Sequence, residues 1–416
     1  MSLKSDDDLP YKVGNWANYK IDKVYYFAIR VTNINAIAEV FGEQIAKRIS
    51  ELVHASMIEI FDGCYFDGSV RVRDIGAFDL SIGQNWLGAA QLDAAESVIQ
   101  RLGRWFRDVS LTVHEAGDAQ LVAAITLLKL DSTSARQGPQ LALDGAHAKL
   151  VSNEKSLFQG DHWRPAYAKE MRLAVEWMQS LVAGELQLSW IPVRSLQNSR
   201  EVAYFHGQLC AISSNGMLVD TARSIHAIRQ LGFDPALDIE TLSRALDLAS
   251  RSAGPHILID ISASTINSSF WLISQMIDAI NTDKITRLLI QIIPDCFIDE
   301  KCLSKCMKIL RERGIGLGII IYGSNQMYRN SMILIQPEFI SISPMFARSI
   351  LGRPETMEAV WTICALARVI APMVVLQGID TPLLAEHARR AGIVWGEGEY
   401  LGAPSWQTPR EHISRS

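Results

Sequence analysis

The feature that most constrains the fold is a series of short, uninterrupted apolar segments that alternate with helical patterns in the second half of the chain. Strands that are apolar on both faces are typical of a buried parallel sheet covered by helices. This many repeats favours closure into a TIM-like (β/α) barrel, in which functional groups gather at the carboxyl ends of the strands. The expected strands are residues 186–193, 202–210, 257–261, 288–293, 317–321, 339–342 and 373–376.

A different pattern precedes the barrel, and 416 residues are too many for one ordinary core. The order of elements predicts an α+β domain rather than a parallel repeat. The expected elements are a strand at 24–31, a helix at 34–61, a hairpin at 70–82 that turns at 74–77, a helix at 92–106 and a strand at 121–130.

The region between these halves is polar at 130–165, where Gly and Pro predict loops, and becomes helical at 167–181. Met171, Val175 and Met178 give this helix one apolar stripe, which is most often buried and less often a dimerisation seam, so a homodimer stays open. The predicted organisation is an N-terminal tail (1–20), an α+β domain (21–165), a linker helix (166–182), a barrel domain (183–408) and a C-terminal tail (409–416).

Charge and hydropathy narrow the class of protein. The net charge of −5 argues against a nucleic-acid partner, because such binding depends on clustered Lys and Arg. The start MSLKSDDDLPYKVG is acidic where a signal peptide is apolar, and the most apolar stretch, 365–379, contains Arg368 and Pro372. No membrane span is expected, and the predicted location is cytoplasmic. Cys302 and Cys306, four residues apart without a nearby His, do not predict a metal site.

Four segments, in order, resemble the EAL family of barrel phosphodiesterases, which hydrolyse the bacterial messenger cyclic di-GMP with two divalent metals. The resemblance runs from Ala183 to Pro404. Its closing segment carries Gly378, Thr381, Gly392, Gly398, Gly402 and Pro404 in the family's places. The four segments are GELQLSWIPVRSL, HILIDISASTI, RERGIGLGIIIYGSNQMY and VVLQGIDTPLLAEHARRAGIVWGEGEYLGAP.

The resemblance also implies that the catalytic residues have been replaced. Two-metal hydrolysis needs several carboxylates around one cavity to hold the two ions. The family's EAL letters fall at His206, Gly207 and Gln208, its asparagine at Asp260, its next glutamate at Gln291, its paired aspartates at Ile320 and Ile321, its lysine at Ser341, its later glutamate at Gln377 and its last glutamine at Glu397. No Asp or Glu occurs in 314–325, so no shift of register restores the pair. No catalytic residue, metal or cofactor is therefore predicted.

Substrate contacts are expected to be missing as well. The family's phosphate-binding arginine corresponds to Cys210, and its glutamine before proline corresponds to Ile191. This argues against cyclic di-GMP binding by the usual route. His206, Asp260 and Glu397 leave a new one-metal site open, but hydrogen-bonded filling of a remodelled pocket is the favoured interpretation.

The first half is similar, more loosely, to the GGDEF domain that often precedes EAL. Phe41 and Gly42 stand where that family has Tyr-Gly, and its signature hairpin corresponds to RVRDIGAFDLSI, in which only the final aromatic, Phe78, is kept. Arg30 and Thr32 replace its metal-binding aspartates, so the resemblance implies an inactive domain.

Together these features predict a degenerate GGDEF–EAL pseudoenzyme of bacterial signalling that regulates by contacting an unknown protein partner. The alternatives are a noncatalytic cyclic di-GMP receptor, a residual cyclic di-GMP phosphodiesterase and an enzyme of altered chemistry. An RNA-binding adaptor is disfavoured by the charge.

Overall fold

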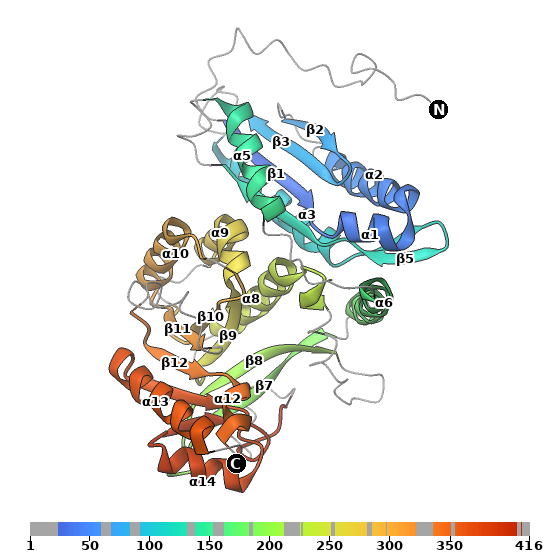
Figure 1. Ribbon diagram of the computed structural model, residues 1–416. Helices are drawn as coiled ribbons and strands as arrows, with labels where there is room; N and C mark the ends of the chain where they lie inside the picture. The colour runs from blue at the N-terminus through green and yellow to red at the C-terminus, as the bar shows by residue number, and fades with distance from the viewer. Residues whose placement is uncertain are drawn as a thin grey trace, which may run out of the picture. The chain divides into compact units, whose positions relative to one another are not determined.

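The chain forms two compact units, Met1–Ala168 and Lys169–Ser416, each described here by itself (Figure 1). The computed structural model describes residues 24–59, 68–83, 92–130, 138–152, 162–182, 186–211, 225, 228–250, 254–280, 285–296, 298–321, 336–350, 354–405 and 409. Both predicted tails lie outside these residues, apart from position 409, and the predicted domain boundaries stay predictions.

The first unit is built on a four-stranded sheet with the strand order β2-β3-β1-β6. β1 (Val24–Val31) lies inside the sheet, where it pairs antiparallel with β3 and with β6, and its residues Phe27, Ala28 and Ile29 are fully buried. The other elements are α1 (Ile34–Phe41), α2 (Glu43–Glu59), β2 (Gly68–Asp74), β3 (Ala77–Gly83), α3 (Leu92–Ser110), β4 (Val113–Ala116), β5 (Ala119–Val122), β6 (Ile125–Lys129) and α5 (Pro139–Ser152). The α+β order and the hairpin turn before Ala77 are confirmed.

Three predictions in this unit are wrong in detail. The single helix expected at 34–61 is broken at Gly42, whose φ of 103° is unfavourable for other residues. The single strand expected at 121–130 is two strands, because β5 leaves the main sheet to pair with β4. The loop region at 130–165 contains α5, which has little amphipathic pattern but buries Leu143, Ala146 and Leu150 against Ala28 of β1. This helix is therefore stabilised by its tertiary contacts rather than by a local amphipathic pattern.

The second unit contains a closed barrel of eight strands in the order β10-β11-β12-β13-β14-β7-β8-β9. Its strands are β7 (Leu186–Ser195), β8 (Val202–Ala211), β9 (Ile257–Ser262), β10 (Leu288–Ile293), β11 (Gly316–Ile321), β12 (Phe339–Ile342), β13 (Met373–Gln377) and β14 (Trp395–Glu397). The barrel is confirmed, and all seven expected strands are present. The eighth, β14, was missed because three residues are too few to show a pattern. A wholly parallel sheet is also wrong, since β7 runs antiparallel to both β8 and β14.

Helices connect and surround the strands, as the ribbon shows for the barrel unit (Figure 1). They are α8 (Asp234–Ser250), α9 (Ala263–Asp278), α10 (Glu300–Glu312), α12 (Pro344–Ile350), α13 (Pro354–Ile370) and α14 (Pro382–Arg390), while α6 (Trp163–Val182) begins in the first unit and ends in the second. The predicted helix at 167–181 is therefore α6, with Met171, Val175 and Met178 buried. Among the described residues, no helix is both long enough and apolar enough to cross a membrane.

An apolar layer of side chains fills part of the barrel interior. Its position along the strands fixes where the next layer, which contains the candidate functional residues, lies. A buried cluster joins inward-facing residues of five strands: Val193, Tyr204, Leu258, Phe339 and Val375. Gly318 makes room for this layer, because a Cβ at that position would lie 2.2 Å from the Phe339 ring. Since side chains alternate along a strand, residues two positions further along form the next layer, toward the carboxyl ends of the parallel strands.

Candidate functional site

The next layer contains seven of the eight counterpart residues predicted from the sequence. His206, Asp260, Ser341 and Gln377 each follow a residue of the apolar cluster by two positions on β8, β9, β12 and β13. The pairing registers of the strands place Gln291 beside Asp260, Ile320 beside Ser341 and Glu397 beside Gln377. Ile321 follows Ile320 directly, so it points to the other face of β11 and is only partly buried.

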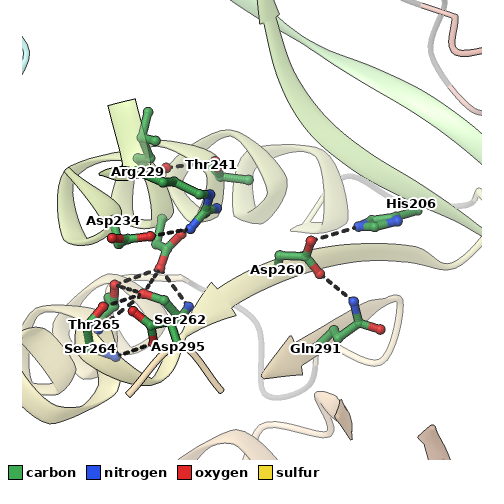
Figure 2. Close-up of polar contacts among 12 residues, drawn as sticks. His206, Arg229, Asp234, Thr241, Asp260, Ser262, Ser264, Thr265, Gln291 and Asp295 are labelled. Atoms are coloured by element: carbon green, nitrogen blue, oxygen red, sulfur yellow. Dashed lines mark hydrogen bonds and ion pairs between the residues drawn. The ribbon is translucent and has the colours of Figure 1, made fainter. Parts of the chain in front are cut away.

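His206 is the centre of a buried chain of polar contacts. Its Nδ1 lies 3.1 Å from Glu397 Oε2 and 3.2 Å from Oε1, and its Nε2 lies 3.3 Å from Asp260 Oδ2. The other oxygen of Asp260 accepts a hydrogen bond of 2.7 Å from Gln291 Nε2. Figure 2 shows Asp260 between His206 and Gln291. The structure therefore brings together His206, Asp260 and Glu397, as the sequence suggested, and adds Gln291.

These contacts decide the charge of the layer. Burial opposes protonation of His206, but the carboxylates of Glu397 and Asp260 outweigh it and raise the His206 pKa well above its usual value. Burial would raise the pKa of Asp260, but the neighbouring His206 and the Gln291 hydrogen bond lower it. The raised pKa favours the protonated ring, whose Nδ1 can donate to Glu397 while Nε2 lies at ion-pair distance from Asp260.

This arrangement does not fit the two divalent ions of the family. A protonated imidazole has no lone pair for a metal, Glu397 is already hydrogen-bonded to the ring, and Asp260 lies at ion-pair distance from it. The bridging position on β11 is the hydrocarbon Ile320, which is 2% exposed. Within the described residues, no group of three or more His, Cys, Asp and Glu side chains has a metal-holding arrangement.

Tyr204 belongs to this site although it was not predicted from the sequence. Its ring lies in the apolar layer against Phe339, with 5.6 Å between ring centroids. Burial, together with the negative charges of Glu397 and Asp260, raises the Tyr204 pKa well above its usual value. The hydroxyl therefore stays neutral and is not a nucleophile at physiological pH.

A second polar network lies beside Asp260, and it was also not predicted. Asp238 on α8 accepts hydrogen bonds from Ser262 N at 2.7 Å, Ser262 Oγ at 2.5 Å and Thr265 Oγ1 at 2.6 Å. Arg229 contacts Asp238 at 3.2 Å and Asp234 at 2.8 Å (Figure 2). Ser262 is the N-cap of α9, and a serine directly before a helical pattern is the one signal that pointed to this network.

Two residues at replaced motif positions, Cys210 and Gly207, make structural contacts within the barrel domain. Cys210 is buried, its Sγ lies 3.4 Å from the Gln187 carbonyl oxygen, and burial raises the pKa of its thiol. Gly207 makes room for the indole of Trp190, because a Cβ there would lie 2.6 Å from the ring. Neither residue supplies a charge to the polar layer.

Comparison with known proteins identifies the barrel. The family model of the EAL domain matches residues 174–404. Similar solved structures include the FimX EAL domain of Pseudomonas aeruginosa bound to c-di-GMP, at 18% identity and TM-score 0.46, which covers 56% of this chain and 97% of that chain. The EAL enzyme Bd1971 in its cGMP-bound form is 14% identical with TM-score 0.50 and covers 74% of this chain and 86% of its own. The S helix-GGDEF-EAL portion of Vibrio cholerae LapD, bound to c-di-GMP, is 13% identical with TM-score 0.47 and covers 90% and 88%. No curated protein matches the sequence.

These comparisons correct one prediction. The absence of an arginine at Cys210 and of a glutamine at Ile191 argued against cyclic di-GMP binding, and this prediction is wrong, because similar EAL domains were solved with the dinucleotide bound. A ligand held at a barrel mouth is contacted from several strand ends, so two missing side chains do not decide binding.

Proposed function

Because the chain belongs to the EAL domain family, we propose that it is a cyclic di-GMP signalling protein whose barrel binds the dinucleotide without hydrolysing it. The ligand follows from the family, and the FimX and LapD structures are of those proteins bound to the same ligand. The loss of hydrolysis follows from the polar layer of this chain.

One observation carries the proposal, the buried His206 between Asp260 and Glu397. The family uses metal ions there to stabilise the negative charge that develops on the reacting phosphate and to activate water. In this chain His206, 1% exposed, lies there between two carboxylates, and its raised pKa favours a proton on the ring as the positive charge. Such a group neither activates water nor reaches a phosphate, so it cannot replace the metal ions in the hydrolytic step.

We extend the proposal to the whole chain. The sequence of the first unit supports a degenerate GGDEF-like domain, with Arg30 and Thr32 in place of the family's aspartates. Arg30 and Thr32 lie at the end of β1 and directly after it, so the unit lacks carboxylates at those positions. A protein of this kind acts by binding rather than by catalysis, and its output is a regulatory contact with another protein.

The test is a hydrolysis assay on the full chain with cyclic di-GMP and either Mg²⁺ or Mn²⁺. We expect no linear product above the no-protein background over hours, while an active EAL phosphodiesterase in the same buffer converts its substrate completely. Hydrolysis at rates ordinary for enzymes, about 1 s⁻¹ or more, would contradict the proposal and favour the phosphodiesterase alternative.

Binding is measured separately by titration calorimetry of the full chain with cyclic di-GMP. We expect saturable heat in buffer containing a chelator, because the proposed binding uses no metal. Heat that appears only when Mg²⁺ is added would show that the polar layer takes up ions, and an absence of heat in both buffers would remove the receptor function.

A further inference from the structure

The join between β14 and β7 has the shortest pairing register in the barrel, followed by β13–β14 and β8–β9 with three residue pairs each. Trp395 pairs with Ser195 and Gly396 with Arg194, and these two residue pairs make up the register. By contrast, six residue pairs join β9 to β10. Each ladder pair contributes backbone hydrogen bonds, so β14 is held on this side by far fewer bonds than the strands opposite it.

Pro192 explains why this join is short. On β7, alternate residues direct their backbone toward β14: Leu196 N donates to Val394 O at 2.7 Å, and Trp190 N donates to Ser405 O at 2.7 Å. Pro192 has the same orientation between them but has no N–H to donate. The backbone at Gly402 passes close to the ring of Pro192, since a Cβ on Gly402 would lie 2.5 Å from Pro192 Cγ.

The contact between His206 and Glu397 spans this weak join from inside the barrel. Glu397 is the last residue of β14, and His206 lies on β8, the strand on the far side of β7. The 3.1 Å ion pair therefore connects two strands that share no backbone hydrogen bonds. It acts on β14 at the point where the ladder to β7 is interrupted.

We propose that the His206–Glu397 ion pair is a latch that holds β14 in the closed barrel, and that β14 is the strand at which the barrel opens. Residues 398–405 directly follow β14 and return to β7 at the Trp190–Ser405 bridge, so the opening segment lies between the β14–β7 pairs and this bridge. Opening at this join exposes the polar layer to solvent. The inference does not depend on the proposed function, since a latch on β14 would serve a catalytic barrel equally well.

The test is hydrogen–deuterium exchange with mass spectrometry on the full chain, comparing a peptide that covers 395–405 with one that covers 288–293. His206→Gln removes the charge and should speed exchange at 395–405 at least tenfold, with less than a twofold change at 288–293. Glu397→Gln removes the other charge with little change of shape and should give the same local effect, which keeps the test decisive if the first variant does not fold.

The matched control is Gln291→Leu, which breaks the hydrogen bond to Asp260 in the same layer but beside the six-pair join. We expect it to leave exchange at 395–405 within twofold of the unchanged protein. The latch is overturned if Glu397→Gln leaves 395–405 equally protected, if both peptides speed up together, or if Gln291→Leu loosens 395–405 as much as Glu397→Gln does.

Discussion

His206 shows how one substitution changes the chemistry of a whole layer. A carboxylate at this position would add to the negative charge of Asp260 and Glu397 and favour metal ions. The imidazole instead has a raised pKa that favours its protonated form, and its two nitrogens lie within 3.3 Å of the two carboxylates. The same side chains that could have attracted an ion are thereby neutralised within the protein.

The grouping of His206 with Asp260 and Glu397 could be suggested from the sequence, but the direct contact between His206 and Glu397 could not. The order of the four motif segments was enough to suggest that His206, Asp260 and Glu397 lie near one another at strand ends. The contact with Glu397 joins residues 191 positions apart. It depends on how the first and last strands meet when the barrel closes, and no local pattern contains that register.

The first prediction at this scale concerns pH. The His206 pKa is raised above the ordinary 6.5, so its stabilisation is fully present below about pH 6.5 and is lost as pH rises through the raised value. The Asp260 pKa is lowered from 3.8, so its contribution is present above that pH and is lost as pH falls through the lowered value. Urea unfolding from pH 3 to 10 should show these two losses. In His206→Gln the alkaline loss should disappear, and an unchanged alkaline slope would contradict the assignment.

At the scale of elements, strands and helices were predicted correctly where their own residues define them and were missed where pairing or packing defines them. Seven barrel strands were predicted because each is a continuous apolar run between helices. β14 was missed because its three residues are defined by pairing with β13 and β7 rather than by composition. α5 was missed because its burial against Ala28 is a tertiary contact, while Gly42 was overlooked as the break between α1 and α2.

The second prediction concerns the start of α9. The Ser262 side chain accepts from Thr265 N and donates to Asp238, so it joins the helix cap to α8. Ser262→Ala should lower the free energy of unfolding by about 1–3 kcal/mol, because it removes a cap and leaves a buried carboxylate oxygen with fewer donors. Chemical denaturation measures the change. The control is Ser250→Ala, since Ser250 lies at the exposed end of α8 and should change stability by less than about 0.5 kcal/mol.

At the scale of the whole molecule, the two units have separate cores. The first is centred on Phe27, Ala28 and Ile29 of β1, and the second on the apolar layer around Tyr204 and Phe339. The sequence indicated two units because its hydrophobic pattern changes from that of mixed strands and helices to that of repeated apolar strands. It did not contain the arrangement within the first unit, where β4 and β5 form a separate small sheet.

The third prediction follows from these separate cores. Calorimetry of the full chain should resolve two unfolding transitions, as expected for units with independent interiors. Gly318→Ala places a methyl group against the Phe339 ring and should lower only the barrel transition, by about 1–3 kcal/mol in stability. Gly145→Ala, in α5 with nothing within 4 Å of the new Cβ, should leave the barrel transition unchanged. A single transition shifted by both variants would contradict the separation.

The most direct test of the account is the protonation state of His206 in the folded protein, measured by ¹⁵N NMR of histidine-labelled full chain and assigned with His206→Gln. The account predicts that both His206 nitrogens carry protons at pH 7 and that millimolar Mg²⁺ leaves their signals unchanged. A neutral imidazole at pH 7, or a His206 signal that shifts as Mg²⁺ is added, would contradict it.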